Sequence, residues 1–460
     1  MRRKVFVDRE REVGLLEELW GKPGFALVFV YGRRRVGKTR MLSEFFKGKR
    51  GVYYVAVEAP YEAVCREFSE CVKRSLNMPF SGDVVEVIDA LSRACGERVL
   101  VVVDEFQYVV EADGGVVSRL QRLIDSSLSE RDLVLVLCGS AVSFFEERLL
   151  GYRSPLFGRR TASIKLKPLG FLQVRGFFPR YGLEDLLRVY AVAGGTPAYL
   201  ERLSDEVCFE DNLREAVTPG SYLYDEALNL LRQEVREPRT YLSILSSVAE
   251  GRTSQGEVAS AAHVDPRALV KYVDLLEELE ILVRVRPLGY RRPVRLEFKD
   301  NYFRFWFTYP YRLRSMLESG YVDDAVSYIL ETFNEYLSRV FEGVLAELAP
   351  TLHARGLIDA KPVEVGRWWH KDVEIDVVVR EPGRAAVFME AKWSRVKVRD
   401  AERELRRLEE KTLKTGVTAP ENSYVLVARE VVDAETPYEV DEHRKIIDLK
   451  AISKVLGLKP

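Results

Sequence analysis

Short apolar runs alternate with helical patterns through the first part of the chain. Five runs are rich in β-branched and aromatic residues: 25–31, 52–57, 99–103, 133–138 and 163–166. Strands of a parallel sheet are apolar on both faces because helices cover both sides, and helical patterns separate these runs. The pattern predicts an α/β domain with a parallel sheet over residues 1–168.

The middle of the chain has a different pattern. Helical periodicity without strand signals predicts a small helical domain over residues 169–235. Two helix start signals follow, Ser254 with Glu257 and Asp265 with Pro266. After them come two strand-like runs, 281–286 and 294–298. Two helices followed by a hairpin are typical of a winged helix, which we expect over residues 236–312.

The last part, residues 313–460, again mixes helices and strands. The predicted elements are a helix at 333–348, strands at 374–379, 386–390 and 423–428, and basic helices at 399–415. We therefore expect a second α/β domain here and a multi-domain α/β protein as a whole.

Composition limits the possible functions. The chain has 460 residues, of which 47% are hydrophobic and 31% charged, so it is not a disordered protein. Its net charge of −1 gives no overall attraction to nucleic acid or membrane, so such binding would be local. No apolar run reaches the ~18 residues that span a bilayer, and no signal peptide is evident. We expect a cytoplasmic protein without a membrane partner.

A phosphate-binding motif follows the first predicted strand. Gly32, Gly37, Lys38 and Thr39 complete the pattern G-x4-G-K-[ST]. Glycines let backbone N–H groups turn toward phosphate oxygens, the lysine reaches the β and γ phosphates, and the threonine binds Mg²⁺. The motif predicts ATP or GTP binding. The residues expected to contact the nucleotide here are Gly32, Arg33, Arg34, Arg35, Val36, Gly37, Lys38, Thr39 and Arg40.

Polar residues at the ends of two other strands complete the predicted site. Asp104 is expected to bind the magnesium and Glu105 to act as the base that activates water. Ser140 is placed to touch the γ-phosphate or its water, or else is a cap or turn serine. Arg159 and Arg160 are candidates to neutralise transition-state charge, and the alternative is that they are surface cations.

The predicted winged helix carries mixed charge. Its basic residues are Arg267, Lys271, Arg284, Arg286, Arg291, Arg292 and Arg295, and its acidic residues include Asp274, Glu277, Glu278 and Glu280. The basic residues would contact DNA phosphates, whereas the acidic ones would repel them. The domain is therefore either a DNA contact or a spacer that docks a protein partner.

Three charged residues in the last domain lie on two neighbouring predicted strands. Asp376 is followed fourteen residues later by Glu390, and Lys392 ends the same strand. Two carboxylates can bind one or two magnesium ions while the lysine stabilises phosphate charge, which is the chemistry of phosphodiester cleavage. Glu342, on the preceding helix, is a candidate further ligand. The alternative is an inactive fold in which these charges form salt bridges.

Two resemblances sharpen these expectations. The segments YGRRRVGKTRML (31–42), FVDREREV (6–13), VVDEFQYV (102–109), CGS (138–140) and GGTPAYL (194–200) resemble the archaeal ATPase family of the STAND and AAA+ group of P-loop NTPases. This resemblance implies ATP and Mg²⁺, a helical lid at 169–235, and contacts of Arg9 and Pro197 with the nucleotide base.

The C-terminal order of helix glutamate, strand aspartate, strand Glu-x-Lys and helix resembles the PD-(D/E)XK nuclease-like superfamily over residues 331–430. Together the resemblances imply an ATPase that acts on DNA. The alternative is a nucleotide-dependent switch that acts through protein partners or as a homo-oligomer, with an inactive nuclease-like domain.

Overall fold

The computed structural model describes residues 8–417 and 419–458. It divides into two compact units. Unit 1 comprises Met1–Pro168, Thr196–Ala198 and Glu278–Glu280, and unit 2 comprises Leu169–Gly195, Tyr199–Glu277 and Ile281–Pro460. The prediction of three separate domains within residues 169–460 stays a prediction.

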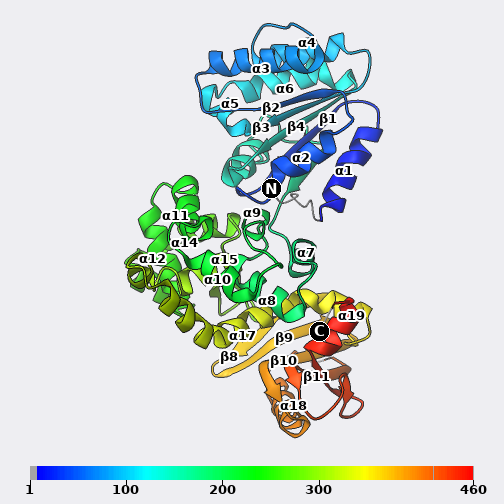
Figure 1. Cartoon of the computed structure of the whole chain (residues 1–460). Coiled ribbons are helices and arrows are strands. Elements are labelled where there is room, and N and C mark those ends of the chain that lie inside the picture. The colour runs from blue at the N-terminus through cyan, green and yellow to red at the C-terminus, as the bar shows by residue number, and fades with distance from the viewer. Residues whose placement is uncertain (1–7, 418, 459–460) are drawn as a thin grey trace. The chain divides into compact units, whose positions relative to one another are not determined.

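Unit 1 is built on a five-stranded parallel sheet, as predicted (Figure 1). Its strands, in spatial order, are β2 (Gly51–Val55), β3 (Val99–Asp104), β4 (Leu133–Gly139), β1 (Ala26–Tyr31) and β5 (Ala162–Lys165). Its α-helices are α1 (Glu10–Gly21), α2 (Lys38–Phe46), α3 (Tyr61–Leu76), α4 (Val84–Ala94), α5 (Phe106–Ala112) and α6 (Val116–Ser126). A π-helix, Phe144–Leu149, follows β4.

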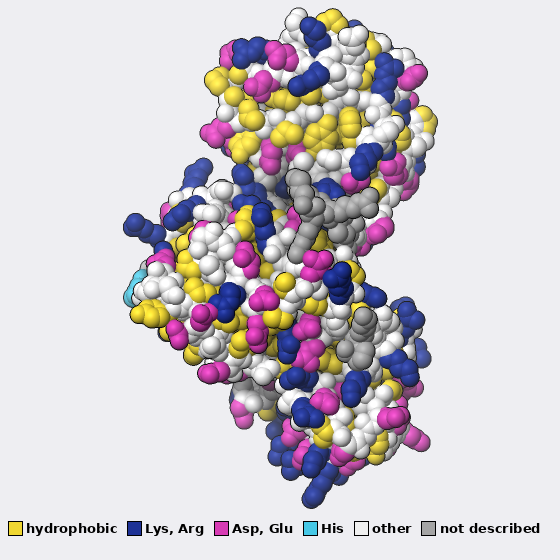
Figure 2. Space-filling view, viewed as in Figure 1, with side chains coloured by type: hydrophobic (Ala, Val, Ile, Leu, Met, Phe, Trp, Pro, Cys, Tyr) yellow, Lys and Arg dark blue, Asp and Glu magenta, His cyan; other side chains and the backbone are white. Residues whose placement is uncertain are grey.

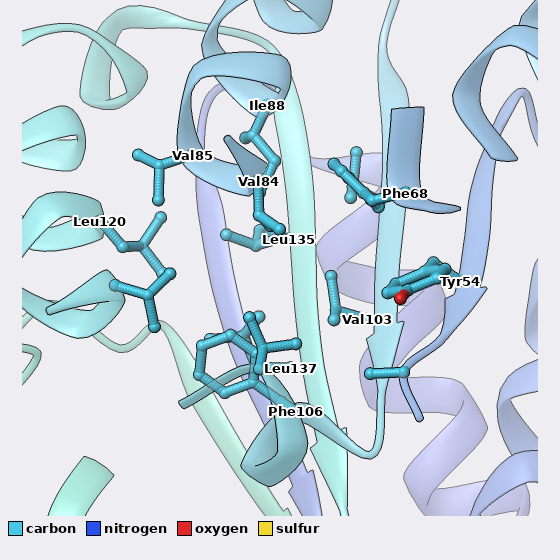
Figure 3. Close-up of a cluster of buried hydrophobic side chains, with 14 of the residues drawn as sticks. Tyr54, Phe68, Val84, Val85, Ile88, Val103, Phe106, Leu120, Leu135 and Leu137 are labelled. Carbon is cyan, nitrogen blue, oxygen red and sulfur yellow. The ribbon is translucent and has the colours of Figure 1, made fainter. Parts of the chain in front are cut away.

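Each face of this sheet packs against its own hydrophobic cluster. Along β1, Leu27 and Phe29 belong to one cluster, and Val28 and Val30 belong to the other. Figure 3 shows part of the first cluster, in which Val103 and Leu135 of the sheet lie near Phe68 and Ile88 of the covering helices. Burial on both faces explains why the strands are continuous apolar runs.

Unit 2 begins with helices and a hairpin. The helices are α7 (Phe171–Val174), α8 (Leu183–Ala193), α10 (Phe209–Val217), α11 (Tyr222–Glu234), α12 (Pro238–Ala249), α13 (Gln255–Ala261), α14 (Pro266–Glu278), α15 (Asn301–Thr308) and α16 (Arg314–Glu318). The hairpin strands are β6 (Leu282–Val285) and β7 (Arg295–Phe298). The predicted capping box is present, because Ser254 accepts from the Glu257 amide while the Glu257 side chain accepts from the Ser254 amide. Between α8 and α10, the short helix α9 (Pro197–Leu200) crosses the boundary of the two units.

The rest of unit 2 contains a six-stranded mixed sheet. Its strands are β12 (Tyr438–Glu439), β13 (Arg444–Asp448), β11 (Glu421–Val431), β10 (Ala385–Val396), β9 (Val373–Glu381) and β8 (Glu364–His370), in this spatial order. The helices of this part are α17 (Val322–Ala354), α18 (Val398–Thr412) and α19 (Leu449–Leu456). Strands β8, β12 and β13 and helix α19 are additions to the predicted set.

The predicted helix at 333–348 is too short, because α17 has 33 residues. Buried positions such as Ala325, Val326 and Ile329 continue the helical spacing before the predicted start. Pro350 lies inside the last turns without ending the helix.

Lys and Arg side chains gather over α18 on the face shown in Figure 2. Several of them are balanced on the same helix, since Arg403 pairs with Asp400 at 3.0 Å and Arg407 with Glu404 at 2.7 Å. Across the described ranges, no helix is long and apolar enough to cross a membrane.

Candidate functional site

The chain turns sharply where β1 ends. Gly32 has φ +151°, and a Cβ there would lie 2.2 Å from the backbone oxygen of Leu166. Arg35 and Gly37 also have positive φ, of +73° and +97°, and α2 begins at the next residue. The loop therefore curls against the backbone that follows β5, and position 32 has room only for glycine.

The ammonium of Lys38 lies inside this loop. Its Nζ donates to the carbonyl of Gly32 at 2.7 Å and to that of Arg33 at 3.1 Å. The Lys38 side chain is buried. A buried positive charge held between two carbonyls can move to phosphate oxygens without a large rearrangement.

Oxygen atoms gather beside the loop at Asp104. Its Oδ2 accepts from Thr39 Oγ1 at 2.8 Å and from the Tyr53 hydroxyl at 2.9 Å, and the side chain is 1% exposed. Burial and the Asp104 carboxylate raise the pKa of Tyr53, so the phenol stays protonated as a donor. Hydroxyl and carboxylate oxygens are the ligand types that Mg²⁺ prefers. The donor set formed by Thr39 and Asp104 therefore fits magnesium.

Glu105 is held at the same edge of the sheet. Its Oε2 accepts from Ser140 Oγ at 2.9 Å, from the Ser140 amide at 3.3 Å and from Gln107 Nε2. A Cβ on Gly139 would lie 2.2 Å from Gln107 Oε1, so the glycine leaves the space that the Gln107 side chain occupies. Sequence reasoning missed Gln107, whose one signal is its place two residues after Glu105.

Arg9 and Pro197, predicted to border the base, both lie beside the loop. Arg9 Nη2 donates to the carbonyl of Lys167 at 2.6 Å and to that of Val36 at 3.3 Å, and burial lowers the pKa of Arg9. Pro197 Cγ lies 3.8 Å from the position of a Cβ on Gly37. The two residues thus flank the backbone of the loop.

The other predicted arginines of the loop contact protein groups. Arg33 is 2% exposed and donates to Thr196 Oγ1 at 2.6 Å and to the Leu279 carbonyl at 3.4 Å. Arg34 donates to the Tyr108 hydroxyl at 3.2 Å, and Arg40 pairs with Glu44 at 3.6 Å. The side chains of Arg33, Arg34 and Arg40 are thus engaged with other groups of the protein.

Arg159, a candidate for transition-state charge, is held by Asp125. Its Nε and Nη2 donate to the two carboxylate oxygens at 2.6 and 2.8 Å. This bidentate pair favours the surface-cation interpretation.

The C-terminal candidates are brought together by neighbouring strands. β9 and β10 are antiparallel, with Val377 opposite Met389. Asp376 Oδ2 accepts from the Ala391 amide at 2.8 Å. Glu390, which is 6% exposed, accepts from Lys392 at 2.8 Å and from Lys411 of α18 at 2.9 Å. We refer to Glu342, Asp376 and Glu390 as the carboxylate cluster.

Burial and neighbouring carboxylates raise the pKa of two members of this cluster. Burial and Asp376 raise the pKa of Glu342 to about 7, and burial and Glu390 raise the pKa of Asp376 to about 6. Arg367 of β8 pairs with Glu342 at 3.0 Å. Within 8–417 and 419–458, no group of three or more His, Cys, Asp or Glu side chains is arranged to hold a metal ion. Cations of the protein thus balance the carboxylate cluster, and sequence reasoning missed Arg367 and Lys411.

The β6–β7 hairpin packs against the C-terminal sheet of unit 2. The Leu288 amide donates to the Arg367 carbonyl, and the Tyr290 hydroxyl to the Thr415 carbonyl, both at 2.8 Å. Two predicted DNA contacts are also engaged within the chain. Arg284 pairs with Asp274 at 2.8 Å and with Glu277, and Arg295 pairs with Glu374 at 3.2 Å. Because of these ion pairs, fewer basic side chains are available to contact DNA than the sequence suggested.

Comparison with known proteins bears on the whole chain. Residues 6–203 match the family described as an ATPase domain predominantly from Archaea. An uncharacterized protein of Methanocaldococcus jannaschii is 31% identical over 436 residues, which cover 94% of this chain and 97% of that protein. The chain belongs to this archaeal ATPase family. The match confirms the predicted P-loop ATPase domain.

This archaeal ATPase has further relatives. Residues 306–404, which include Asp376, Glu390 and Lys392, match a family described as "Archaea bacterial proteins of unknown function". An uncharacterized ATP-binding protein of M. jannaschii is 41% identical over 46 residues, which are 10% of this chain and 78% of that protein. A Walker-type ATPase of Pyrococcus abyssi has a similar fold, with a TM-score of 0.51 and 18% identity over 66% of this chain and 97% of that one. The STAND, winged-helix and nuclease-like resemblances stay predictions.

Proposed function

We propose that this archaeal ATPase binds ATP with Mg²⁺ at the loop from Gly32 to Thr39 and hydrolyses it. The observation that carries the proposal is the joint placement of Thr39 and Asp104, whose oxygens are 2.8 Å apart beside the buried ammonium of Lys38. A hydroxyl, a carboxylate and a lysine beside one loop are the groups that phosphoryl transfer requires.

Each residue has a separate task in this proposal. The loop amides bind phosphate oxygens, and Lys38 neutralises their charge. Bound magnesium supplies further positive charge, and Thr39 and Asp104 would hold it. Glu105 takes the proton of the attacking water. Ser140 orients the Glu105 carboxylate by donating to it from both its hydroxyl and its amide.

Arg33 supports a link between the nucleotide and the rest of the molecule. It follows Gly32 directly and donates to Thr196 and Leu279. These two residues belong to short parts of unit 1 whose flanking segments continue into unit 2. Movement of the loop on binding or hydrolysis would therefore be felt where the chain enters unit 2. We propose that ATP turnover drives this motion and that the motion acts on DNA or on a protein partner.

Phosphate release from ATP tests the hydrolysis. We expect turnover that requires magnesium and stops in EDTA, and a fall of about 100-fold or more in Asp104→Asn. Asp125→Asn, at the surface ion pair with Arg159, is the matched control and should leave turnover unchanged. Magnesium-independent turnover, or equal turnover in Asp104→Asn, would contradict the assigned site.

A second candidate function is metal-dependent cleavage of DNA. The observation that favours it is the proximity of Asp376, Glu390 and Lys392 on β9 and β10. Burial and the Asp376 carboxylate also raise the pKa of Glu342. Such a pair of carboxylates with a lysine suits metal-assisted attack on a phosphodiester. The alternative is an inactive cluster that stabilises unit 2 in a switch acting through protein partners or a homo-oligomer.

Cleavage assays with magnesium or manganese separate these alternatives. A nuclease site predicts cleavage that survives in Lys38→Ala, disappears in Asp376→Asn and persists in Asp372→Asn, a control in the exposed turn between β8 and β9. If the wild-type protein cleaves neither DNA nor RNA, the cluster is structural.

A further inference from the structure

Unit 2 contains a polar cavity of about 620 Å³ beside α17. We refer to it as the α17 cavity. Its walls come from α12, β7, α15, α17, β8 and β9, all of which except β7 are labelled in Figure 1. The volume lies in the range of small-molecule sites, so it admits a short stretch of a single nucleic-acid strand and is too small for a duplex.

One stripe of α17 runs along the cavity. The residues that α17 contributes include Tyr328, Thr332, Glu335, Arg339 and Glu342, at alternating steps of four and three. This spacing places them on one helix face, and the stretch from the first to the last covers about 21 Å at ~1.5 Å per residue. The stripe ends at Glu342, a member of the carboxylate cluster. An extended ligand therefore fits this lining better than a compact one.

Three arginines of the cavity lining have no ion pair among the described residues. Four of its five glutamates form ion pairs within the chain: Glu250 with Arg252, Glu297 and Glu342 with Arg367, and Glu374 with Arg295 and Arg367. Arg304, Arg312 and Arg339 also line the cavity, and none of these three arginines has an ion pair in the part of the chain that the structure describes. Glu335 is the remaining acidic residue. The five arginines and five glutamates of the lining balance in formal charge, and the arginines without ion pairs are the groups that can take an anion.

Arg304 has a buried hydrogen-bond donor without an acceptor in the described part of the chain. Its Nη2 donates to the Phe298 carbonyl at 2.8 Å, which fixes the side chain. Its Nε is buried and has no hydrogen-bond partner among the described residues. A buried donor left without a partner is costly, and an anion in the cavity would satisfy it.

We propose that the α17 cavity binds a single strand of nucleic acid. Arg304, Arg312 and Arg339 take its phosphates, and Tyr328, which is 47% exposed, offers a ring on which a base stacks. Aromatic rings beside cations are how proteins hold single strands without sequence preference. The proposal goes beyond ATP binding, and it requires neither hydrolysis nor cleavage.

Fluorescence anisotropy tests the binding. The probe is a short fluorescein-labelled oligothymidylate, mixed with the full-length protein in EDTA so that no cleavage occurs. We expect the double variant Arg312→Ala/Arg339→Ala to bind about tenfold or more weakly. The slope of log K against log salt should fall in magnitude by about 1.4, at ~0.7 per lost phosphate contact. Both arginines are exposed and without ion pairs, so the fold should be unaffected.

Two further variants sharpen the test. Tyr328→Ala should weaken binding about fivefold or more, and Tyr328→Phe should restore it because the ring remains. The matched control Lys73→Ala/Arg74→Ala removes the same charge from the exposed last turn of α3 and should bind as wild type does. Arg267→Ala/Lys271→Ala removes it from α14, the competing predicted DNA contact.

Three outcomes would overturn the proposal. The first is no binding by the wild type. The second is a loss in the α14 variant with none in the cavity variant, which would move the site to α14. The third is displacement of the probe by thymidine monophosphate or inorganic phosphate as efficiently as by unlabelled strand, at equal phosphate concentration. That result would make the cavity a site for small phosphates.

Discussion

Replacing Glu105 by glutamine removes one charge and keeps the shape of the side chain. Glu105 Oε2 accepts from the Ser140 hydroxyl at 2.9 Å and from the Ser140 amide at 3.3 Å. An amide oxygen can keep accepting from these donors, so we expect a loss of only about 1 kcal/mol in folding free energy. It cannot take a proton from water, and general bases contribute about 10²–10⁴ in rate. Turnover should fall about 100-fold or more, which is ~2.7 kcal/mol at ~1.36 kcal/mol per tenfold.

Two measurements on the same preparation check this. Steady-state phosphate release gives the rate, and equilibrium binding of a fluorescent ATP analogue should be within about threefold of wild type. Glu111→Gln, on the exposed face of α5, is the matched control and should leave both unchanged. Ser140→Ala keeps the charge and loses one orienting donor, so it should cost about tenfold at most. If Glu105→Gln turns over ATP within about threefold of wild type, the base is another group.

The other predictions concern the loop and the carboxylate cluster. Thr39→Val removes the hydroxyl that faces Asp104 and should abolish the magnesium dependence of ATP binding, whereas Thr39→Ser should retain that dependence. If ATP affinity depends on magnesium equally in the two variants, the role of the hydroxyl is refuted. Gly32→Ala forces a Cβ to 2.2 Å from the backbone oxygen of Leu166 and should lower both the melting temperature and the nucleotide-induced shift, and an unchanged melting curve would be inconsistent with that contact. The raised pKa of Glu342, about 7 against an ordinary 4.5, means that the folded state holds this proton more tightly than the unfolded chain. The free energy that the tighter proton binding adds to folding is fully present below pH 4.5 and is lost as the pH rises through 7. In EDTA, the free energy of unfolding of the wild type relative to Glu342→Gln should therefore fall across that range, as measured by urea unfolding followed by tryptophan fluorescence. A constant difference would show that Glu342 titrates normally.

The nucleotide site was accessible from sequence because its determinants are local. Gly32 to Thr39 form one continuous motif after a buried strand, and Asp104 and Glu105 directly follow another. In a parallel sheet the carboxyl ends of the strands share one edge, so residues distant in sequence meet there without further information. The same reasoning placed Ser140 at the end of β4, between β1 and β3.

The C-terminal site depends on contacts that no local pattern carries. Sequence spacing indicated that Asp376 and Glu390 lie on neighbouring strands. It could not indicate that Arg367 would pair with Glu342, or that Lys411 would reach Glu390 from α18, because those partners are set by how helices and strands pack. The docking of the β6–β7 hairpin is hidden for the same reason.

Isothermal titration calorimetry with ATP and magnesium tests the central claim most directly. The loop of Gly32 to Thr39 should bind one nucleotide per chain with measurable heat, and the heat should disappear in Lys38→Ala while Lys47→Ala, an exposed lysine just beyond α2, titrates as wild type does. If wild-type protein gives no heat at millimolar ATP, or if Lys38→Ala binds as tightly as wild type, the curl after β1 is not a triphosphate site.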